Sequence, residues 1–233
     1  MQVVILAGGL GTRLSEETDF IPKPMVKIGP EPILVHLMRY FASFGHSKFV
    51  IAAGYKHEVI SDYFQDFDES WDIKIVNTGL GASTGGRILL LEEHLEENFM
   101  LTYGDGLGDV DLPKLEAAFN ERKYIALVTA VRPPARFGSL RVEADLVTSF
   151  NEKNPQDEGW INGGFFICNK SVLKYITDLE EPFEGKPISG LVKDRMLGVH
   201  QHTGWWHPMD TLRDKRQLEE IWESGSIPWV RLA

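Results

Sequence analysis

Short apolar runs alternate with longer amphipathic stretches along the 233 residues of this chain. The apolar runs predict strands at Val3–Ala7, Phe49–Ala53, Ile73–Val76, Phe99–Tyr103, Ala126–Val131 and Gly163–Ile167. Apolar residues at helical spacing predict helices at Pro32–Phe44, His57–Tyr63, Thr84–Leu95, Asp111–Arg122 and Thr211–Ser224. This alternation is typical of a sheet whose strands are joined by crossover helices.

The strands of the first half are almost wholly apolar, as expected for parallel strands that are covered on both faces. After residue 135 the pattern changes, and Gly138–Val142 and Leu146–Phe150 predict a β-hairpin that turns at Ala144–Asp145. We therefore predict an α/β fold: a Rossmann-like mixed, mostly parallel sheet flanked by helices, with an antiparallel-rich second half. Residues 1–135 and 136–233 should pack as a single domain with a ligand cleft at the carboxyl ends of the parallel strands.

Charge and composition narrow the possible partners. The formal net charge of −10 repels nucleic acid and acidic membranes, although a few cations can still hold a phosphate in one cleft. The single cysteine, Cys168, lies in an apolar run and is predicted to be buried, which fits a reducing compartment. No stretch approaches the 18 uninterrupted apolar residues of a membrane span. We expect a cytoplasmic protein with neither nucleic acid nor membrane as a partner.

A glycine-rich loop follows the first strand at once, in the segment Leu6–Leu14. Its glycines let backbone N–H groups approach phosphate oxygens, and Arg13 adds a permanent cation. The loop fits neither a Walker A motif nor a dinucleotide fingerprint, so a tight strand-to-helix turn is the alternative interpretation. Further on, Pro22–Met25 holds Lys23 between two prolines, which stiffen the backbone around a lysine that could bind an anion or simply be solvated.

An aspartate ends the apolar strand Phe99–Tyr103, in the sequence Gly104–Asp105–Gly106. At the carboxyl end of a buried strand its side chain should point into the cleft. Mg²⁺ prefers one or two carboxylates together with phosphate oxygens and water. Asp105 is therefore a candidate metal ligand, and a plain turn aspartate is the alternative.

Together, the loop Leu6–Leu14 and the segment Pro22–Met25 resemble the signature of the sugar-phosphate nucleotidylyltransferases. The resemblance implies an Mg²⁺-dependent enzyme that joins a nucleoside triphosphate to a sugar-1-phosphate and releases pyrophosphate. It also implies a nucleotide-diphospho-sugar transferase-like fold, with residues 1–135 as the nucleotide-binding half and residues 136–233 as the sugar-phosphate-binding half. The implied nucleotide-binding residues are Leu6, Ala7, Gly8, Gly9, Gly11, Thr12, Arg13, Lys23, Arg87 and Gly104.

The resemblance assigns the metal to two aspartates, Asp105 and Asp210. Asp210 lies just before the last predicted helix, where a helix N-cap is the alternative interpretation. The catalytic residues implied in this way are Arg13, Lys23, Asp105, Lys153 and Asp210.

On the acceptor side, Ser149–Lys153 resembles the Glu–Lys–Pro motif of the family, in which glutamate contacts the sugar and lysine its phosphate. This chain departs from the motif, because Asn154 stands where the family has proline. A second segment, Trp160–Gly164, resembles a family strand that binds sugar hydroxyls, and the alternative is a turn at a strand edge. The implied sugar-phosphate-binding residues are Glu152, Lys153, Asn162 and Gly163.

Longer phrases resemble one branch of the family, the glucose-1-phosphate cytidylyltransferases: Leu10–Thr18, Thr84–Arg87, Arg136–Gly138 and Pro208–Lys215. This branch implies CTP and glucose-1-phosphate as substrates and a homo-oligomeric enzyme. Members of the branch carry a longer insertion where this chain has only Gln65–Trp71, which bears on the acceptor and the oligomer contacts.

Donor choice should depend on the loop carbonyls of Leu6–Gly9, which can accept from the cytosine amine, and on Arg87. The Arg87 guanidinium could reach a pyrimidine carbonyl or a phosphate, or it could be a surface helix residue. Three alternatives stay open: a uridylyl- or thymidylyltransferase, a cytidylyltransferase with another acceptor, and a non-catalytic regulatory module that binds nucleotides. The presence of Asp105 and Lys153 argues against the regulatory module.

Overall fold

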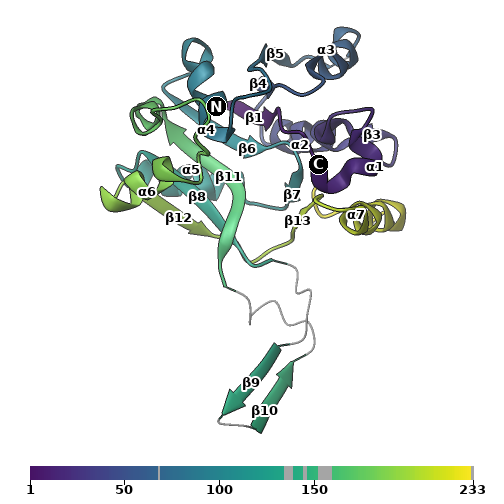
Figure 1. Ribbon diagram of the computed structural model, residues 1–233, viewed down its shortest axis with the longest axis vertical. Helices are drawn as coiled ribbons and strands as arrows, with labels where there is room; N and C mark the ends of the chain where they lie inside the picture. The colour runs from purple at the N-terminus through teal and green to yellow at the C-terminus, as the bar shows by residue number, and fades with distance from the viewer. Residues whose placement is uncertain (68, 134–138, 144–145, 152–158, 232–233) are drawn as a thin grey trace.

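A computed structural model describes residues 1–67, 69–133, 139–143, 146–151 and 159–231. Its centre is a seven-stranded sheet with helices on both faces (Figure 1). In spatial order the strands are β12 (Leu197–Gln201), β8 (Ala126–Val131), β11 (Ile161–Asn169), β6 (Asn98–Tyr103), β1 (Gln2–Ala7), β4 (Lys48–Ala53) and β5 (Asp72–Asn77). Every strand that the apolar runs predicted is present.

The sheet is mixed and mostly parallel, as predicted. Strand β1 pairs in parallel with β4 and β6, β4 with β5, and β12 with β8. Strand β11 is antiparallel to both of its neighbours, β6 and β8. One continuous sheet therefore joins strands from both halves of the chain.

Three short antiparallel pairs complete the strands: β2 (Lys27–Ile28) with β3 (Glu31–Pro32), β7 (Gly106–Gly108) with β13 (Trp206–Pro208), and β9 (Ser139–Glu143) with β10 (Leu146–Asn151). The last pair confirms the predicted hairpin. The turn predicted at Ala144–Asp145 lies outside the described residues.

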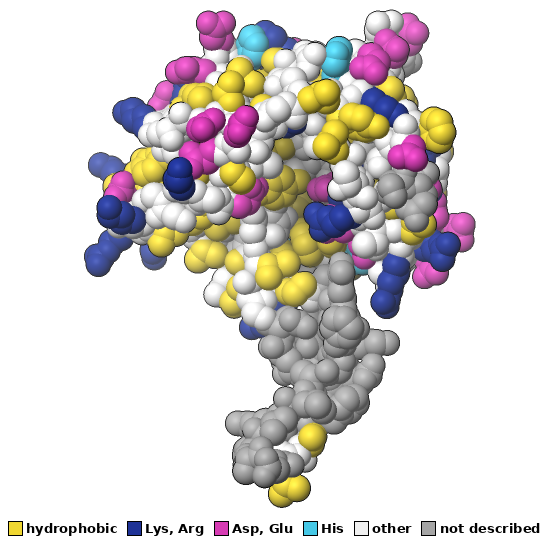
Figure 2. Space-filling view, in the orientation of Figure 1, with side chains coloured by type: hydrophobic (Ala, Val, Ile, Leu, Met, Phe, Trp, Pro, Cys, Tyr) yellow, Lys and Arg dark blue, Asp and Glu magenta, His cyan; other side chains and the backbone are white. Residues whose placement is uncertain are grey.

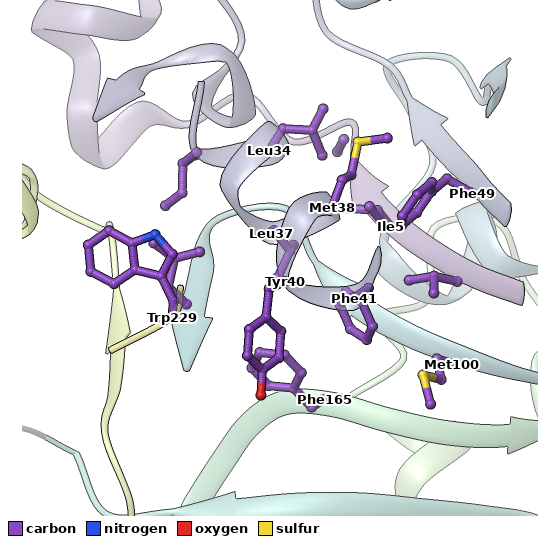
Figure 3. Close-up of a cluster of buried hydrophobic side chains, with 14 of the residues drawn as sticks. Ile5, Leu34, Leu37, Met38, Tyr40, Phe41, Phe49, Met100, Phe165 and Trp229 are labelled. Carbon is purple, nitrogen blue, oxygen red and sulfur yellow. The ribbon is translucent and has the colours of Figure 1, made fainter. Parts of the chain in front are cut away.

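The central sheet is buried on both faces because successive side chains of a strand point to opposite sides. In β1, Val3 and Ile5 join one hydrophobic cluster, whereas Val4 and Leu6 join another. Figure 3 shows the first cluster, where Phe41 of α2 and other apolar side chains lie against the sheet. Full burial of one such side chain contributes about 1.5–3 kcal/mol, so the near-continuous apolar strands are what the two layers of helices require.

The α-helices are α1 (Ser15–Thr18), α2 (Ile33–Ala42), α3 (His57–Gln65), α4 (Thr84–Leu90), α5 (Leu112–Glu121), α6 (Lys186–Lys193) and α7 (Leu212–Ser224). Four 3-10 turns are also described: η1 (Thr12–Leu14), η2 (Lys23–Met25), η3 (Glu92–His94) and η5 (Lys170–Tyr175). The helix predicted at Thr84–Leu95 is shorter than expected, because it ends at Leu90 and continues as η3. In the described part of the chain, no helix has both the length and the apolar character needed to span a membrane.

Cys168 is fully buried in the second cluster, as predicted. Burial raises the pKa of its thiol, because a thiolate has no stabilising partner in an apolar core. Cys168 is therefore a packing residue in this protein.

Candidate active site

A cleft of about 870 Å³ opens at the carboxyl ends of β1 and β6. Its walls come from the glycine loop, the proline-flanked Lys23, the turn after β6 and the start of β11. Figure 2 shows a hollow in the middle of the face in view, with basic and acidic side chains adjoining at its rim. A cleft at this edge of a mostly parallel sheet is the position predicted from the strand pattern.

All ten residues that were predicted to bind the nucleotide line this cleft: Leu6, Ala7, Gly8, Gly9, Gly11, Thr12, Arg13, Lys23, Arg87 and Gly104. Gly11 has a φ of +66°, a left-handed conformation that glycine adopts without strain. It turns the chain from β1 into η1, which presents Thr12 and Arg13 as exposed side chains. The loop is thus both a tight turn and part of the cleft wall.

Arg87 supports the glycine loop from behind. Its guanidinium is buried and donates to the carbonyl oxygens of Gly8 (2.8 Å) and Gly79 (2.9 Å) and to the hydroxyl of Thr78. A side chain at Gly8 would place its Cβ 2.2 Å from Arg87 Nη1, so it would displace this hydrogen-bonded guanidinium. Burial lowers the pKa of Arg87. The interpretation as a surface helix residue is wrong, and a contact from Arg87 to the nucleotide stays a prediction.

The two aspartates, far apart in the sequence, meet through the short β7–β13 ladder. Its register pairs Pro208 with Gly106, and beyond the ladder the Met209 N–H donates to the Asp105 carbonyl at 2.8 Å. Residues 105 and 210 are therefore neighbours at the end of this ladder. The ladder, rather than any local motif, builds the acidic pair.

Lys23 bridges the acidic pair. Its Nζ lies 2.6 Å from Asp105 Oδ2 and 2.7 Å from Asp210 Oδ1, while Arg13 Nη1 lies 2.9 Å from Asp210 Oδ2. The Lys23 side chain is 9% exposed. Burial alone would lower the pKa of Lys23, but the two carboxylates outweigh it and the net shift is upward. Two cations and two anions, all predicted as catalytic residues, thus form one cluster in the cleft.

Asp210 is not the N-cap of α7. Thr211 holds that position: its hydroxyl accepts from the Asp214 N–H, and the Asp214 carboxylate accepts from the Thr211 N–H in a capping box. The helix is capped without Asp210, so the Asp210 carboxylate is directed to Lys23 and Arg13 in the cleft.

The acidic pair fits a divalent cation. Because Lys23 Nζ contacts both carboxylates, a metal ion bound at the position of that Nζ could also contact both. Among the residues that the structure describes, no group of three or more His, Cys, Asp or Glu could hold a metal. A metal here would complete its shell with phosphate oxygens and water, which is the coordination that Mg²⁺ prefers.

The predicted sugar side is placed in part. Asn162 and Gly163 line the cleft, whereas Glu152 and Lys153 lie outside the described residues. The Asn162 amide donates to the Tyr103 hydroxyl at 3.0 Å and accepts from the Gly164 N–H at 2.8 Å. Asn162 is therefore held across the end of β6, facing the same cleft as the acidic pair.

Several residues of the cleft wall were not predicted, among them Tyr103, Glu184 and Trp206. Tyr103 ends the strand before Asp105, a position that could have suggested it. Glu184 lies in a loop before α6, and nothing in the local sequence distinguishes it from a solvated glutamate. Trp206 donates from Nε1 to the Gly163 carbonyl at 2.8 Å and so fixes the start of β11 to β13.

Comparison with known proteins identifies the family. A family model described as nucleotidyl transferase matches residues 2–207. A glucose-1-phosphate cytidylyltransferase of Salmonella typhi is 42% identical, with 98% of each chain covered. A D-glycero-alpha-D-manno-heptose 1-phosphate guanylyltransferase of Aneurinibacillus thermoaerophilus is 34% identical, over 83% of this chain and 90% of that protein.

Among solved structures, HddC from Yersinia pseudotuberculosis complexed with GMP-PN has a TM-score of 0.74 and 26% identity, and the match covers 95% of this chain and 99% of that one. The fold is therefore that of known nucleotidyltransferases, as the sequence resemblance implied. This chain therefore belongs to the nucleotidyl transferase family.

Proposed function

We propose that this enzyme transfers the cytidylyl group of CTP to glucose-1-phosphate, giving CDP-glucose and pyrophosphate. One observation carries the proposal. The glycine loop, two cations and two carboxylates face one cleft, in a chain that is 42% identical over its whole length to a glucose-1-phosphate cytidylyltransferase.

In the proposed reaction, a phosphate oxygen of the acceptor forms a bond to the α-phosphorus of CTP. The bond from that phosphorus to the oxygen shared with the β-phosphorus breaks, and pyrophosphate leaves. The acceptor is already an oxyanion, so no side chain has to act as the nucleophile. The chain must instead hold two anions together and neutralise their charge.

The charged residues divide this work. We assign Arg13 and Lys23 to the phosphates of CTP, and Lys153 to the phosphate of the acceptor. Asp105 and Asp210 would hold Mg²⁺, which would supply further positive charge to the triphosphate. In this structure Lys23 contacts both carboxylates. With a metal ion held by those carboxylates, the Lys23 ammonium group would be available to contact phosphate.

For the base, we assign selection to the glycine loop. The carbonyls of Leu6 and Gly8 already accept hydrogen bonds, from the Gly104 N–H and from Arg87 respectively. Gly9 is exposed in the loop, so its carbonyl is our first candidate to accept from the amine of cytosine. The O4 carbonyl of UTP would face such an acceptor unpaired, which costs about 1–3 kcal/mol.

We also propose that residues 1–135 bind the nucleotide and residues 136–233 the sugar phosphate, within one domain. A homo-oligomer stays a prediction, and light scattering coupled to gel filtration measures it directly.

Product identification tests the proposed function. Purified protein with CTP, glucose-1-phosphate and Mg²⁺ should release pyrophosphate and form CDP-glucose, identified by mass spectrometry. An Asp105→Asn preparation under the same conditions controls for contaminating activity. Tight binding of CTP without turnover of any sugar-1-phosphate would instead favour the regulatory module.

A further inference from the structure

Glu184 is held in the cleft by residues from two other elements. The Thr84 hydroxyl, at the start of α4, donates to Glu184 Oε2 at 2.6 Å. The Tyr103 hydroxyl, at the end of β6, donates to Glu184 Oε1. Thr84 is itself fixed, because its hydroxyl accepts from the Phe183 N–H at 2.8 Å. A carboxylate tied at both oxygens is a positioned group rather than a freely rotating surface side chain.

The position of Glu184 marks one end of the cleft. Glu184 and Asn162 line both the main cleft and an adjoining apolar recess of about 280 Å³. Asn162 also donates to the Tyr103 hydroxyl at 3.0 Å, so the three side chains form one chain of hydrogen bonds. Tyr103 connects them to the acidic pair, since Asp105 follows it by two residues.

Asp105 and Asp210 contact Lys23 and Arg13, whereas Glu184 is held by two hydroxyl groups. Its carboxylate would therefore repel a phosphate group placed beside it. It is well suited to hydroxyl groups, which donate strong hydrogen bonds to an ionised acceptor. A carboxylate has about four lone-pair sites, and the contacts to Thr84 and Tyr103 use one on each oxygen. One site on each oxygen is left to accept from two neighbouring hydroxyls of a sugar ring.

We propose that Glu184 is an acceptor-specificity residue, whose carboxylate, oriented by Thr84 and Tyr103, accepts hydrogen bonds from two adjacent hydroxyls of the sugar-1-phosphate. This inference rests on the proposed function and adds the residue that recognises the sugar itself. Asn162 supplies a neighbouring amide on the same side of the cleft.

Substrate kinetics on Glu184→Gln and Glu184→Ala test the proposal. We expect kcat/KM for glucose-1-phosphate to fall by about ten- to a hundredfold, the usual effect of losing hydrogen bonds to a charged group. The affinity for CTP, measured by calorimetry, should stay within about twofold, because the proposed ligand of Glu184 is the sugar of the acceptor. Glu180→Gln is the matched control, since Glu180 is exposed in the same loop and does not line the cleft.

Deoxy acceptors locate the contact. Of 2-, 3- and 4-deoxyglucose-1-phosphate, the two that lack the contacted hydroxyls should give wild-type enzyme a lower kcat/KM than glucose-1-phosphate does. For Glu184→Ala, removal of the same hydroxyls should lower kcat/KM little further. Such a non-additive result identifies the hydroxyls and cannot come from a purely structural role. Thermal unfolding of each variant checks that the fold is kept.

Two results would overturn the inference while leaving the proposed function intact. One is an unchanged kcat/KM for glucose-1-phosphate in both Glu184 variants. The other is a loss of CTP affinity as large as the loss of acceptor use. Absence of turnover by wild-type enzyme would overturn the proposed function, and the inference with it.

Discussion

Replacing Lys23 by methionine should destabilise the metal-free protein in a way that Mg²⁺ repairs. Methionine keeps the apolar stem of this buried side chain and removes only its charge. Lys23 Nζ lies 2.6 Å from one carboxylate and 2.7 Å from the other, so without it two negative charges remain about 5 Å apart at most. In an effective dielectric of about 20 their repulsion is about 3 kcal/mol.

Solvent reduces this cost, because the side chains of Asp105 and Asp210 are 31% and 22% exposed. We expect a net loss of about 1–2 kcal/mol, which lowers the Tm by about 3–6 °C for a chain of this size. The measurement is thermal unfolding in excess EDTA and again in millimolar Mg²⁺. Mg²⁺ should raise the Tm of Lys23→Met more than that of wild type, and calorimetry with Mn²⁺ should show tighter binding to the variant.

Lys215→Met is the matched control. Lys215 also contacts two carboxylates, Glu17 at 2.5 Å and Glu219 at 3.7 Å, and its side chain is 18% exposed. Its loss should lower the Tm without selective repair by Mg²⁺. If Lys23→Met keeps the wild-type Tm in EDTA, or if Mg²⁺ stabilises it no more than it stabilises wild type, Lys23 does not neutralise a metal-binding pair of carboxylates.

Three further predictions follow from the cleft. Asp105→Asn should lower kcat by about a hundredfold or more while the fold is kept, and excess EDTA should abolish turnover by wild-type enzyme. A near-wild-type rate in either experiment would contradict the assignment of Asp105 to a metal ion. Arg87→Met removes the hydrogen bonds that a buried guanidinium donates to Gly8, Thr78 and Gly79 and should cost about 2–4 kcal/mol in urea unfolding, together with a loss of CTP affinity. Unchanged CTP binding would show that Gly8 does not need this support. Lys153→Ala should weaken acceptor binding by about tenfold while the Kd for CTP stays within about twofold, measured in separate calorimetric titrations. The reverse pattern would show that Lys153 contacts CTP and not the acceptor.

The sheet could be predicted from sequence because its signal is local. A strand such as β1 is apolar at every position from Val3 to Ala7 since both of its faces are buried, and no other element of this length has that pattern. The glycine loop was equally readable, because Gly8 and Gly11 occupy positions where a side chain would clash or be strained.

The cleft could be predicted only in part, because its geometry depends on contacts distant in sequence. Asp105 and Asp210 meet through three-residue strands, which are too short to leave a periodic pattern. Arg87 resembles a helix surface residue until the fold places Gly8 and Gly79 around its guanidinium. Glu184 has no motif at all, and only the folded chain brings it to Tyr103.

A competition assay tests whether CTP is the preferred donor of this enzyme. The enzyme is given equal concentrations of CTP, UTP, dTTP and GTP with glucose-1-phosphate and Mg²⁺, and the nucleotide sugars formed early in the reaction are quantified by mass spectrometry. Their ratios equal the ratios of kcat/KM for the four donors. We predict that CDP-glucose exceeds each other product by about ten- to a hundredfold. A different nucleotide sugar formed at an equal or higher rate would contradict it.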